Sequence, residues 1–239
     1  MAKVLIKELQ SYKKQYAVPR KTLIDNLEEA VVEEKKIEEM DVVFLMDRFG
    51  YAKTIDMAAY ERNREAADAE NRYVLTCKNT DKICIFTNKG QMHLLKVLDL
   101  PFGKFRDKGT PIDNLSNYNS SEENFVYITN LGAICNHKLI FGTKMAMLKI
   151  VDGSEFDVAK RTTAATKLTD GDEVLFVHPV TGNETIVMQS ERDFFLRIAV
   201  DSIPEKKKVR SASAACGLRT EMRLPRFICS ARARALRRK

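Results

Sequence analysis

Three histidines and five cysteines are the residues of this 239-residue sequence that most often carry metal or nucleophile chemistry. The histidines His93, His137 and His178 are isolated from one another, whereas a metal site needs several ligands at a short, fixed spacing. The cysteines form no Cys-x-x-Cys pair, and their odd number indicates free thiols in a reducing compartment. Cys77 and Cys84 fall in apolar stretches, where we expect buried thiols. The sequence therefore predicts no catalytic residue, no bound metal and no cofactor in this chain.

Lysine and arginine supply the other reactive groups, because their side chains bind phosphate and similar anions. The formal net charge is +7 and the isoelectric point is about 9.1, a range typical of nucleic-acid-binding proteins. The charge is uneven: residues 1–40 carry 8 basic and 8 acidic side chains, residues 41–203 carry 20 and 23, and residues 204–239 carry 12 and 2. Nucleic-acid binding by the central region must therefore depend on local groups of cations.

Short β-hairpins are the elements that would position these cations. Residues 42–56 place two apolar runs around Asp47-Arg48-Phe49-Gly50, and glycine tolerates the positive φ of a tight turn. Similar units recur at residues 82–98, 138–151 and 184–200, with Gly90, Ala146 and Asp193 at the turn position. Turn spacings of 40, 56 and 47 residues are typical of bladed β architectures.

An apolar strand is expected ahead of each later hairpin, which gives three or more strands per blade. These strands are residues 73–77, 125–129 and 174–177. The segments 61–71, 103–119 and 152–172 are polar, and we expect them to be loops between blades. Gly142, Gly153, Gly171 and Gly182 are expected in turns.

Three regions follow from this pattern. Residues 1–27 form an N-terminal helix, predicted over residues 2–17, and a connector; residues 28–203 form the bladed domain; residues 204–239 are a basic tail expected to be disordered or weakly helical. No apolar run approaches the ~20 residues of a membrane span, and no secretory signal is visible.

The hairpin units resemble a known family. The runs 49–53, 87–90 and 194–198 are similar to the blades of the C-terminal domain of bacterial type IIA topoisomerase A subunits, which belong to DNA gyrase and topoisomerase IV. Residues 13–23 resemble the segment that joins the coiled-coil arm to this domain, and residues 108–115 resemble the stretch that leads into a following blade. Residues 167–174 resemble the opening of a blade's first strand. The resemblance covers about residues 1–208. It implies an all-β fold: a propeller-like β-pinwheel with about four blades, possibly incomplete, preceded by a short N-terminal helix.

The resemblance also implies a function. Such a domain binds and bends or wraps duplex DNA on a basic rim, and it supports ATP-dependent change of DNA topology by the whole enzyme. The catalytic tyrosine lies in another domain, so this chain is not expected to cleave DNA alone. The implied partners are duplex DNA, the dimeric remainder of the A subunit, and the ATPase B subunit. The implied location is the bacterial cytoplasm, at the nucleoid, with no membrane association.

Two departures from the family pattern stand out. Gyrases carry a glycine-rich basic box after the first hairpin, whereas residues 60–70 here contain no glycine and are net negative. This difference weakens the prediction of gyrase-type wrapping and favours a topoisomerase IV-like subunit. After Lys208 the family continues with another blade, whereas this chain continues with the basic tail.

The resemblance implies that cations in or beside the hairpin turns contact DNA phosphates. The candidates are Lys53, Lys89, Lys144, Lys149 and Arg197, together with Lys104, Arg106 and Lys108 in the segment after the second hairpin. Two alternatives are a propeller-like scaffold for protein partners and an inert, truncated fragment. Steep loss of binding between roughly 50 and 200 mM salt would distinguish phosphate binding from the scaffold.

Overall fold

The computed structural model describes residues 2–19, 21–22, 38–182, 184–189, 195–214 and 226–230. It divides the chain into two units, Met1–Ile37 and Glu38–Lys239. The first unit contains helix α1 (Ala2–Tyr16), as predicted, and every residue of this helix is exposed, including Leu5 and Leu9 of its apolar stripe. Within the described part of the chain, no helix is long and apolar enough to cross a membrane.

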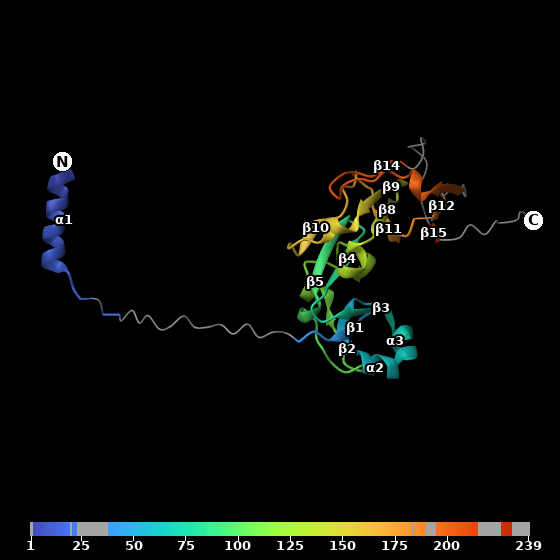
Figure 1. Cartoon of the computed structure of the whole chain (residues 1–239), viewed down its shortest axis with the longest axis horizontal. Coiled ribbons are helices and arrows are strands. Elements are labelled where there is room, and N and C mark those ends of the chain that lie inside the picture. Colours follow the sequence, from blue (N-terminus) through green and yellow to red (C-terminus); the bar gives the residue numbers. More distant parts are fainter. Residues whose placement is uncertain are drawn as a thin grey trace, which may run out of the picture. The chain divides into compact units, whose positions relative to one another are not determined.

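The four predicted hairpins are present in the second unit (Figure 1). They are β1 (Asp41–Asp47) with β2 (Tyr51–Asp56), β4 (Lys82–Thr87) with β5 (Gln91–Lys96), β8 (Lys138–Thr143) with β9 (Met147–Asp152), and β12 (Thr185–Gln189) with β13 (Phe195–Ala199). The predicted turn residues Gly50, Gly90 and Ala146 have φ values of 86°, 73° and 57°. The fourth, Asp193, lies outside the described residues.

The three apolar strands predicted ahead of the later hairpins are also present, but they pair differently from the prediction. They are β3 (Asn71–Lys78), β7 (Phe125–Asn130) and β11 (Val174–Val180). Each pairs with the first strand of the preceding hairpin: β3 with β1, β7 with β4, and β11 with β8. A local pattern identifies a strand, but the partner is set by long-range contacts, which is why the grouping by sequence order was wrong.

A fourth strand reaches each of the first three sheets from beyond the next hairpin. These short strands are β6 (Thr110–Pro111), β10 (Thr162–Ala164) and β14 (Ser213–Ala214), and they pair with β2, β5 and β9. The resulting orders are β3-β1-β2-β6, β10-β5-β4-β7 and β11-β8-β9-β14, with a described fourth sheet of order β13-β12-β15. Successive blades are therefore linked by exchanged strands, as the β-pinwheel prediction requires.

The exchanged strands correct two predictions. The segments 103–119 and 152–172 contain β6 and β10, together with helix α4 (Ile112–Leu115) and the short 3₁₀ helix η2 (Gly153–Phe156), and are not simple loops. The tail is not disordered from residue 204: β14 pairs with the third sheet, and β15 (Arg226–Ser230) pairs with β12. Two further 3₁₀ turns, η1 (Val97–Asp99) and η3 (Val200–Ser202), follow the second and fourth hairpins.

The core lies between successive sheets. Alternate residues of β4 point to opposite faces, as in any strand. Ile83 and Ile85 pack with Phe44 of the first sheet, whereas Cys84 and Phe86 belong to a second cluster shared with the third sheet. A third cluster joins the third and fourth hairpins through residues such as Leu148 and Ile186. The second and third sheets thus bury both faces against their neighbours.

Two helices cover the remaining face of the first sheet. They are α2 (Met57–Arg62) and α3 (Arg64–Glu70). A separate short helix, α5 (Leu131–Cys135), follows β7 later in the chain. Ala67 of α3 is fully buried in a cluster with Val43, Leu45 and Ile55. The prediction of a polar loop over residues 61–71 is therefore wrong, because most of this segment is helical and Ala67 packs against the sheet.

Gly142 is likewise not a turn residue. It lies within β8, and a Cβ atom there would come within 2.0 Å of the Phe176 ring. Gly153 packs close to the Ile134 carbonyl, whereas Gly171 and Gly182 have the positive φ values expected of turns.

Candidate nucleic-acid interface

The first hairpin turn is held in one shape by a carboxylate. Asp47 Oδ1 accepts hydrogen bonds from the backbone N–H groups of Phe49 (2.8 Å) and Tyr51 (2.9 Å). The same turn exposes Arg48 and leaves 88% of Phe49 accessible to solvent. The result is a fixed tip with a cation and an aromatic ring facing outward.

A groove of about 620 Å³ lies beside this tip. Its lining includes Arg48 and Phe49 from the turn and Arg106 and Lys108 from the segment after the second hairpin. The sequence analysis missed Arg48. The sequence did contain a signal for Arg48: it lies two residues before the positive-φ residue of its turn, the same position that the predicted Lys144 occupies in the third hairpin. The groove is not purely basic, because Asp47, Glu70 and Asp107 also line it.

Lys53 holds the basic segment in place. Its Nζ donates hydrogen bonds to the carbonyl oxygens of Phe105 and Asp107, the latter at 2.8 Å, and lies 5.3 Å from the Phe105 ring centroid. Asp107 closes the segment by accepting the Lys104 N–H at 2.7 Å. Lys53 therefore positions its basic neighbours, and its ammonium is already occupied by the protein.

Lys149 is the equivalent residue of the third hairpin, and its prediction as a phosphate contact is wrong. Lys149 is 0% exposed, and its Nζ donates to the carbonyl oxygens of Ala165 (3.2 Å), Lys208 (2.8 Å) and Arg210 (3.1 Å). Burial lowers the pKa of Lys149 from 10.5 to about 8. The lysine anchors the segment that leads into β14 and cannot reach a phosphate in this conformation.

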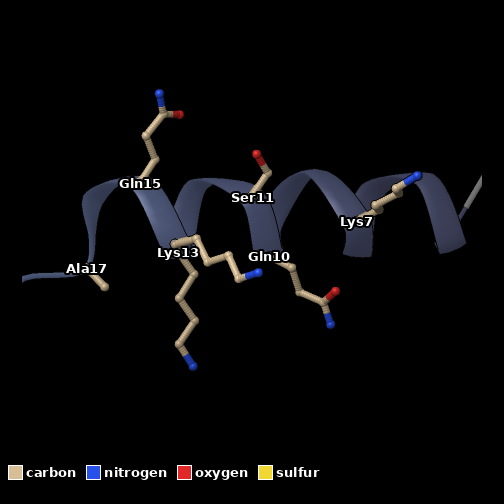
Figure 2. A pocket seen from close by; sticks show the side chains of 7 residues that line it. Lys7, Gln10, Ser11, Lys13, Gln15 and Ala17 are labelled. Carbon is tan, nitrogen blue, oxygen red and sulfur yellow. The ribbon is translucent and has the colours of Figure 1, made fainter.

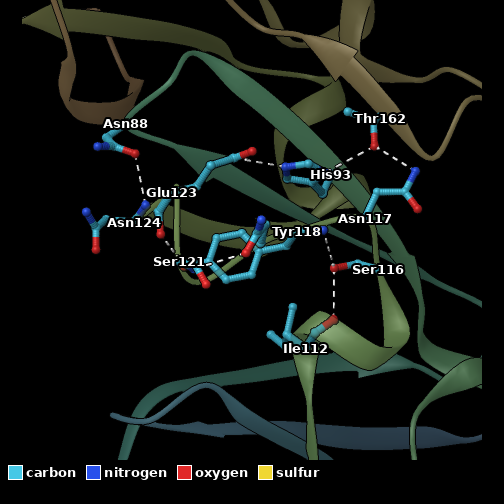
Figure 3. A network of polar contacts seen from close by, with 11 residues as sticks. Asn88, His93, Ile112, Ser116, Asn117, Tyr118, Ser121, Glu123, Asn124 and Thr162 are labelled. Atoms are coloured by element: carbon cyan, nitrogen blue, oxygen red, sulfur yellow. Dashed lines mark hydrogen bonds and ion pairs between the residues drawn. The ribbon is translucent and has the colours of Figure 1, made fainter.

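His93 occupies the same place in the second hairpin (Figure 3). Its Nδ1 lies 3.1 Å from Thr162 Oγ1 on the exchanged strand β10, and its Nε2 lies 3.1 Å from Glu123 Oε2. Tyr118 Oη donates to the Glu123 carbonyl at 2.7 Å, which fixes the carboxylate-bearing segment. His93 is buried. Lys53, His93 and Lys149 each lie three residues after the positive-φ residue of their turn, and we call this the anchor position. In each of the first three hairpins the residue at the anchor position binds an incoming segment.

The other predicted cations lie at the surface. Lys89 is exposed at the second turn, Lys144 is half-buried at the third, and Arg197 is exposed on β13. Lys104, Arg106 and Lys108 are exposed together on the segment held by Lys53. Among the described residues, none of these cations forms an ion pair.

Two other features of the described residues do not form sites. A hollow along α1 is lined by residues of that helix and by Ala17 just after it, and Figure 2 shows side chains such as Gln10, Lys13 and Gln15 diverging from the helix. No three His, Cys, Asp or Glu side chains are grouped to hold a metal ion within the described ranges. Cys77 and Cys84 are buried as predicted, and burial raises both thiol pKa values, that of Cys77 to about 11.

Sequence comparison finds similar proteins. The profile of the family described as "DNA gyrase C-terminal domain, beta-propeller" matches residues 81–118 and 137–181. The A subunit of DNA gyrase from Lawsonia intracellularis is 30% identical over 213 residues, which are 84% of this chain and 26% of that protein. Its counterpart from Helicobacter pylori (strain J99) is 28% identical over 214 residues, 83% of this chain and 26% of that protein. The chain thus spans about a quarter of the length of these relatives.

Solved structures share the fold. The E. coli ParC C-terminal domain matches with a TM-score of 0.64 at 11% identity, covering 79% of each chain. The C-terminal domain of DNA topoisomerase IV matches with a TM-score of 0.57 at 15% identity, covering 81% of this chain and 79% of that one.

Blades linked by exchanged strands define a β-pinwheel, the fold that this chain shares with these solved structures. The chain belongs to the family of C-terminal domains of bacterial type IIA topoisomerase A subunits, as its sequence indicated.

Proposed function

We propose that this chain binds and bends duplex DNA as a non-catalytic module of the A subunit of a type IIA topoisomerase. The observation that carries the proposal is the recurrence of a cation at the turn of each of the first three hairpins: Arg48, Lys89 and Lys144. Arg106 and Lys108 add to the first of these turns through the groove they share with it. Phosphate contacts of this kind fix the position of DNA without reading its sequence.

The energetics require several such contacts. Bending a 20–30 bp segment costs on the order of 1–6 kcal/mol, so one or two surface cations would not suffice. The net charge of residues 41–203 is negative, with 20 basic and 23 acidic side chains, so the binding surface must be the local cation groups.

The activity of the whole protein is part of the same proposal. The chain would work with the dimeric remainder of the A subunit and with the ATPase B subunit in the bacterial cytoplasm, at the nucleoid. DNA cleavage and ATP hydrolysis would reside in those other parts, and this chain would hold and bend the DNA segment.

A matched pair of charge variants tests the proposal in the full chain. The body variant changes five exposed cations to glutamine: Arg48, Lys89, Lys104, Arg106 and Lys108. The tail variant changes five cations that lie outside the described residues: Arg232, Arg234, Arg237, Arg238 and Lys239. Truncation before residue 204 is avoided, because it would remove the carbonyls of Lys208 and Arg210 that Lys149 binds.

The readouts are the affinity for a duplex of about 40 bp and the end-to-end distance of that duplex by energy transfer. We expect the body variant to lose more affinity than the tail variant, and to lose DNA bending. Loss confined to the tail variant would assign binding to the tail and overturn the proposal. A wild-type chain that leaves duplex DNA unbound at low salt, yet binds a protein partner, would favour the scaffold.

A further inference from the structure

The hairpin tips expose apolar side chains at one repeated position. The residue just before the positive-φ residue is Phe49 in the first hairpin and Met145 in the third, and they are 88% and 44% exposed. In the second hairpin the same position holds Lys89. A large apolar side chain at a rigid, solvent-facing tip does not stabilise the fold, because its surface stays in contact with water until a partner covers it.

Both apolar tips are fixed in advance by a carboxylate. Asp47 Oδ1 accepts the Phe49 N–H at 2.8 Å, and Asp172 Oδ1 accepts the Met145 N–H at 2.9 Å. The two carboxylates come from different places in the chain, yet they make the same contact. A tip ordered in this way loses little conformational entropy when it meets a partner.

The surroundings of the tips favour a polyanion as that partner. Arg48 directly precedes Phe49, and Lys144 directly precedes Met145. Arg106 and Lys108 share the groove with Phe49, whereas two of the three carboxylates there, those of Asp47 and Asp107, already accept backbone N–H groups. An apolar wedge flanked by cations is the arrangement with which proteins unstack and kink DNA from its minor groove, and Phe and Met are among the side chains that do so.

We propose that Phe49 inserts between two adjacent base pairs of bound duplex DNA from the minor groove, while Arg48 binds a neighbouring phosphate. Met145 makes the equivalent contact more weakly, because it is half-covered, with Thr169 Oγ1 3.8 Å from its sulfur. Lys89 makes only a phosphate contact. The inference rests on the proposed DNA binding, to which it adds local kinks at the first and third tips in place of a smooth bend.

The experiment uses the full chain and a duplex with 2-aminopurine at a central TA step, since pyrimidine–purine steps unstack easily. Fluorescence of the base reports unstacking, and energy transfer between the duplex ends reports the bend. The variants are Phe49→Ala, Phe49→Leu, which retains an apolar wedge, and the control Phe195→Ala, which removes another exposed phenylalanine (67%) on a strand.

We expect the wild-type chain to raise the fluorescence and shorten the end-to-end distance. At protein saturation Phe49→Ala should lose most of both signals, and its affinity should fall about tenfold, the scale of one lost aromatic–base stack. Phe49→Leu should retain much of the signal, and Phe195→Ala should match the wild type. Because Phe49 is exposed, its variants should unfold at the wild-type temperature.

The outcomes separate the two claims. If Phe49→Ala binds and bends DNA with unchanged fluorescence, the wedge is wrong and the proposed DNA binding stands. If the wild-type chain does not bind the duplex at low salt, both are wrong.

Discussion

The first and third sheets share one plan and use it differently. Both place a lysine at the anchor position, where Lys53 lies opposite Leu45 and Lys149 lies opposite Phe141. Lys53 binds two carbonyls of one exposed segment and stays half-buried, whereas Lys149 binds carbonyls from two separate segments and is fully enclosed. The comparison indicates that one hairpin position serves strand exchange in the first three sheets, and that its side chain is more deeply buried where it binds two incoming segments.

The largest expected effect is the loss of the buried anchor. Lys149→Met leaves three carbonyl oxygens without their donor, and we expect the free energy of unfolding to fall by about 3 kcal/mol. Urea denaturation measures the change, and Lys89→Met at an exposed turn should alter stability by less than about 0.5 kcal/mol. An equal loss in both variants would contradict the structural role of Lys149.

Gly142→Ala should cost about 2 kcal/mol, because the added methyl group meets the Phe176 ring at 2.0 Å. The first sheet has Met46 at the same distance from its turn residue and requires no glycine there. Adding Phe176→Leu should restore part of the stability lost to Gly142→Ala, and strictly additive losses would show that the ring is not the cause.

Lys53→Met should cost about 1 kcal/mol, less than the buried lysine, because it removes hydrogen bonds at a half-exposed site. It should also weaken DNA binding about two- to threefold, since the segment carrying Arg106 and Lys108 would no longer be held. Equilibrium unfolding and duplex titration measure the two effects. If Lys53→Met destabilised the chain as much as Lys149→Met, the distinction between the two sheets would fail.

A further expected effect is a dependence of stability on pH, which comes from the buried Lys149 of the third sheet. Burial lowers the pKa of Lys149 to about 8 in the folded chain, from its ordinary value of 10.5, which applies to the unfolded chain. Between these values the unfolded chain binds more protons, so stability from this group rises with pH; below pH 8 its burial cost is fully present. Compared with Lys149→Met, the wild-type chain should gain stability from about pH 8 to 10.5. A flat or falling difference would contradict the buried charge.

The sequence predicted the elements whose signals are local. Gly50 and Gly90 mark their turns because glycine accepts positive φ, and the apolar runs beside them form the expected strands. The alanines of residues 57–70 are good helix formers and could have revealed α2 and α3, had the acidic residues not suggested a solvated loop.

Strand partners and anchors could not be predicted in this way. Lys149 reads as an ordinary exposed lysine, and its acceptors at Lys208 and Arg210 lie about 60 residues later in the sequence. The two-residue strand β14 has too few residues for any pattern, and only the third sheet gives it a structure.

The salt dependence of duplex DNA binding tests the central claim most directly. For the wild-type chain, the logarithm of the binding constant should fall linearly with the logarithm of salt concentration, with a slope of about −0.9 per phosphate contact. The body variant should lose about 0.9 from that slope for each of its five cations that touches a phosphate, and the tail variant should lose less. An unchanged slope in the body variant, with a reduced slope in the tail variant, would contradict DNA binding by the hairpin turns.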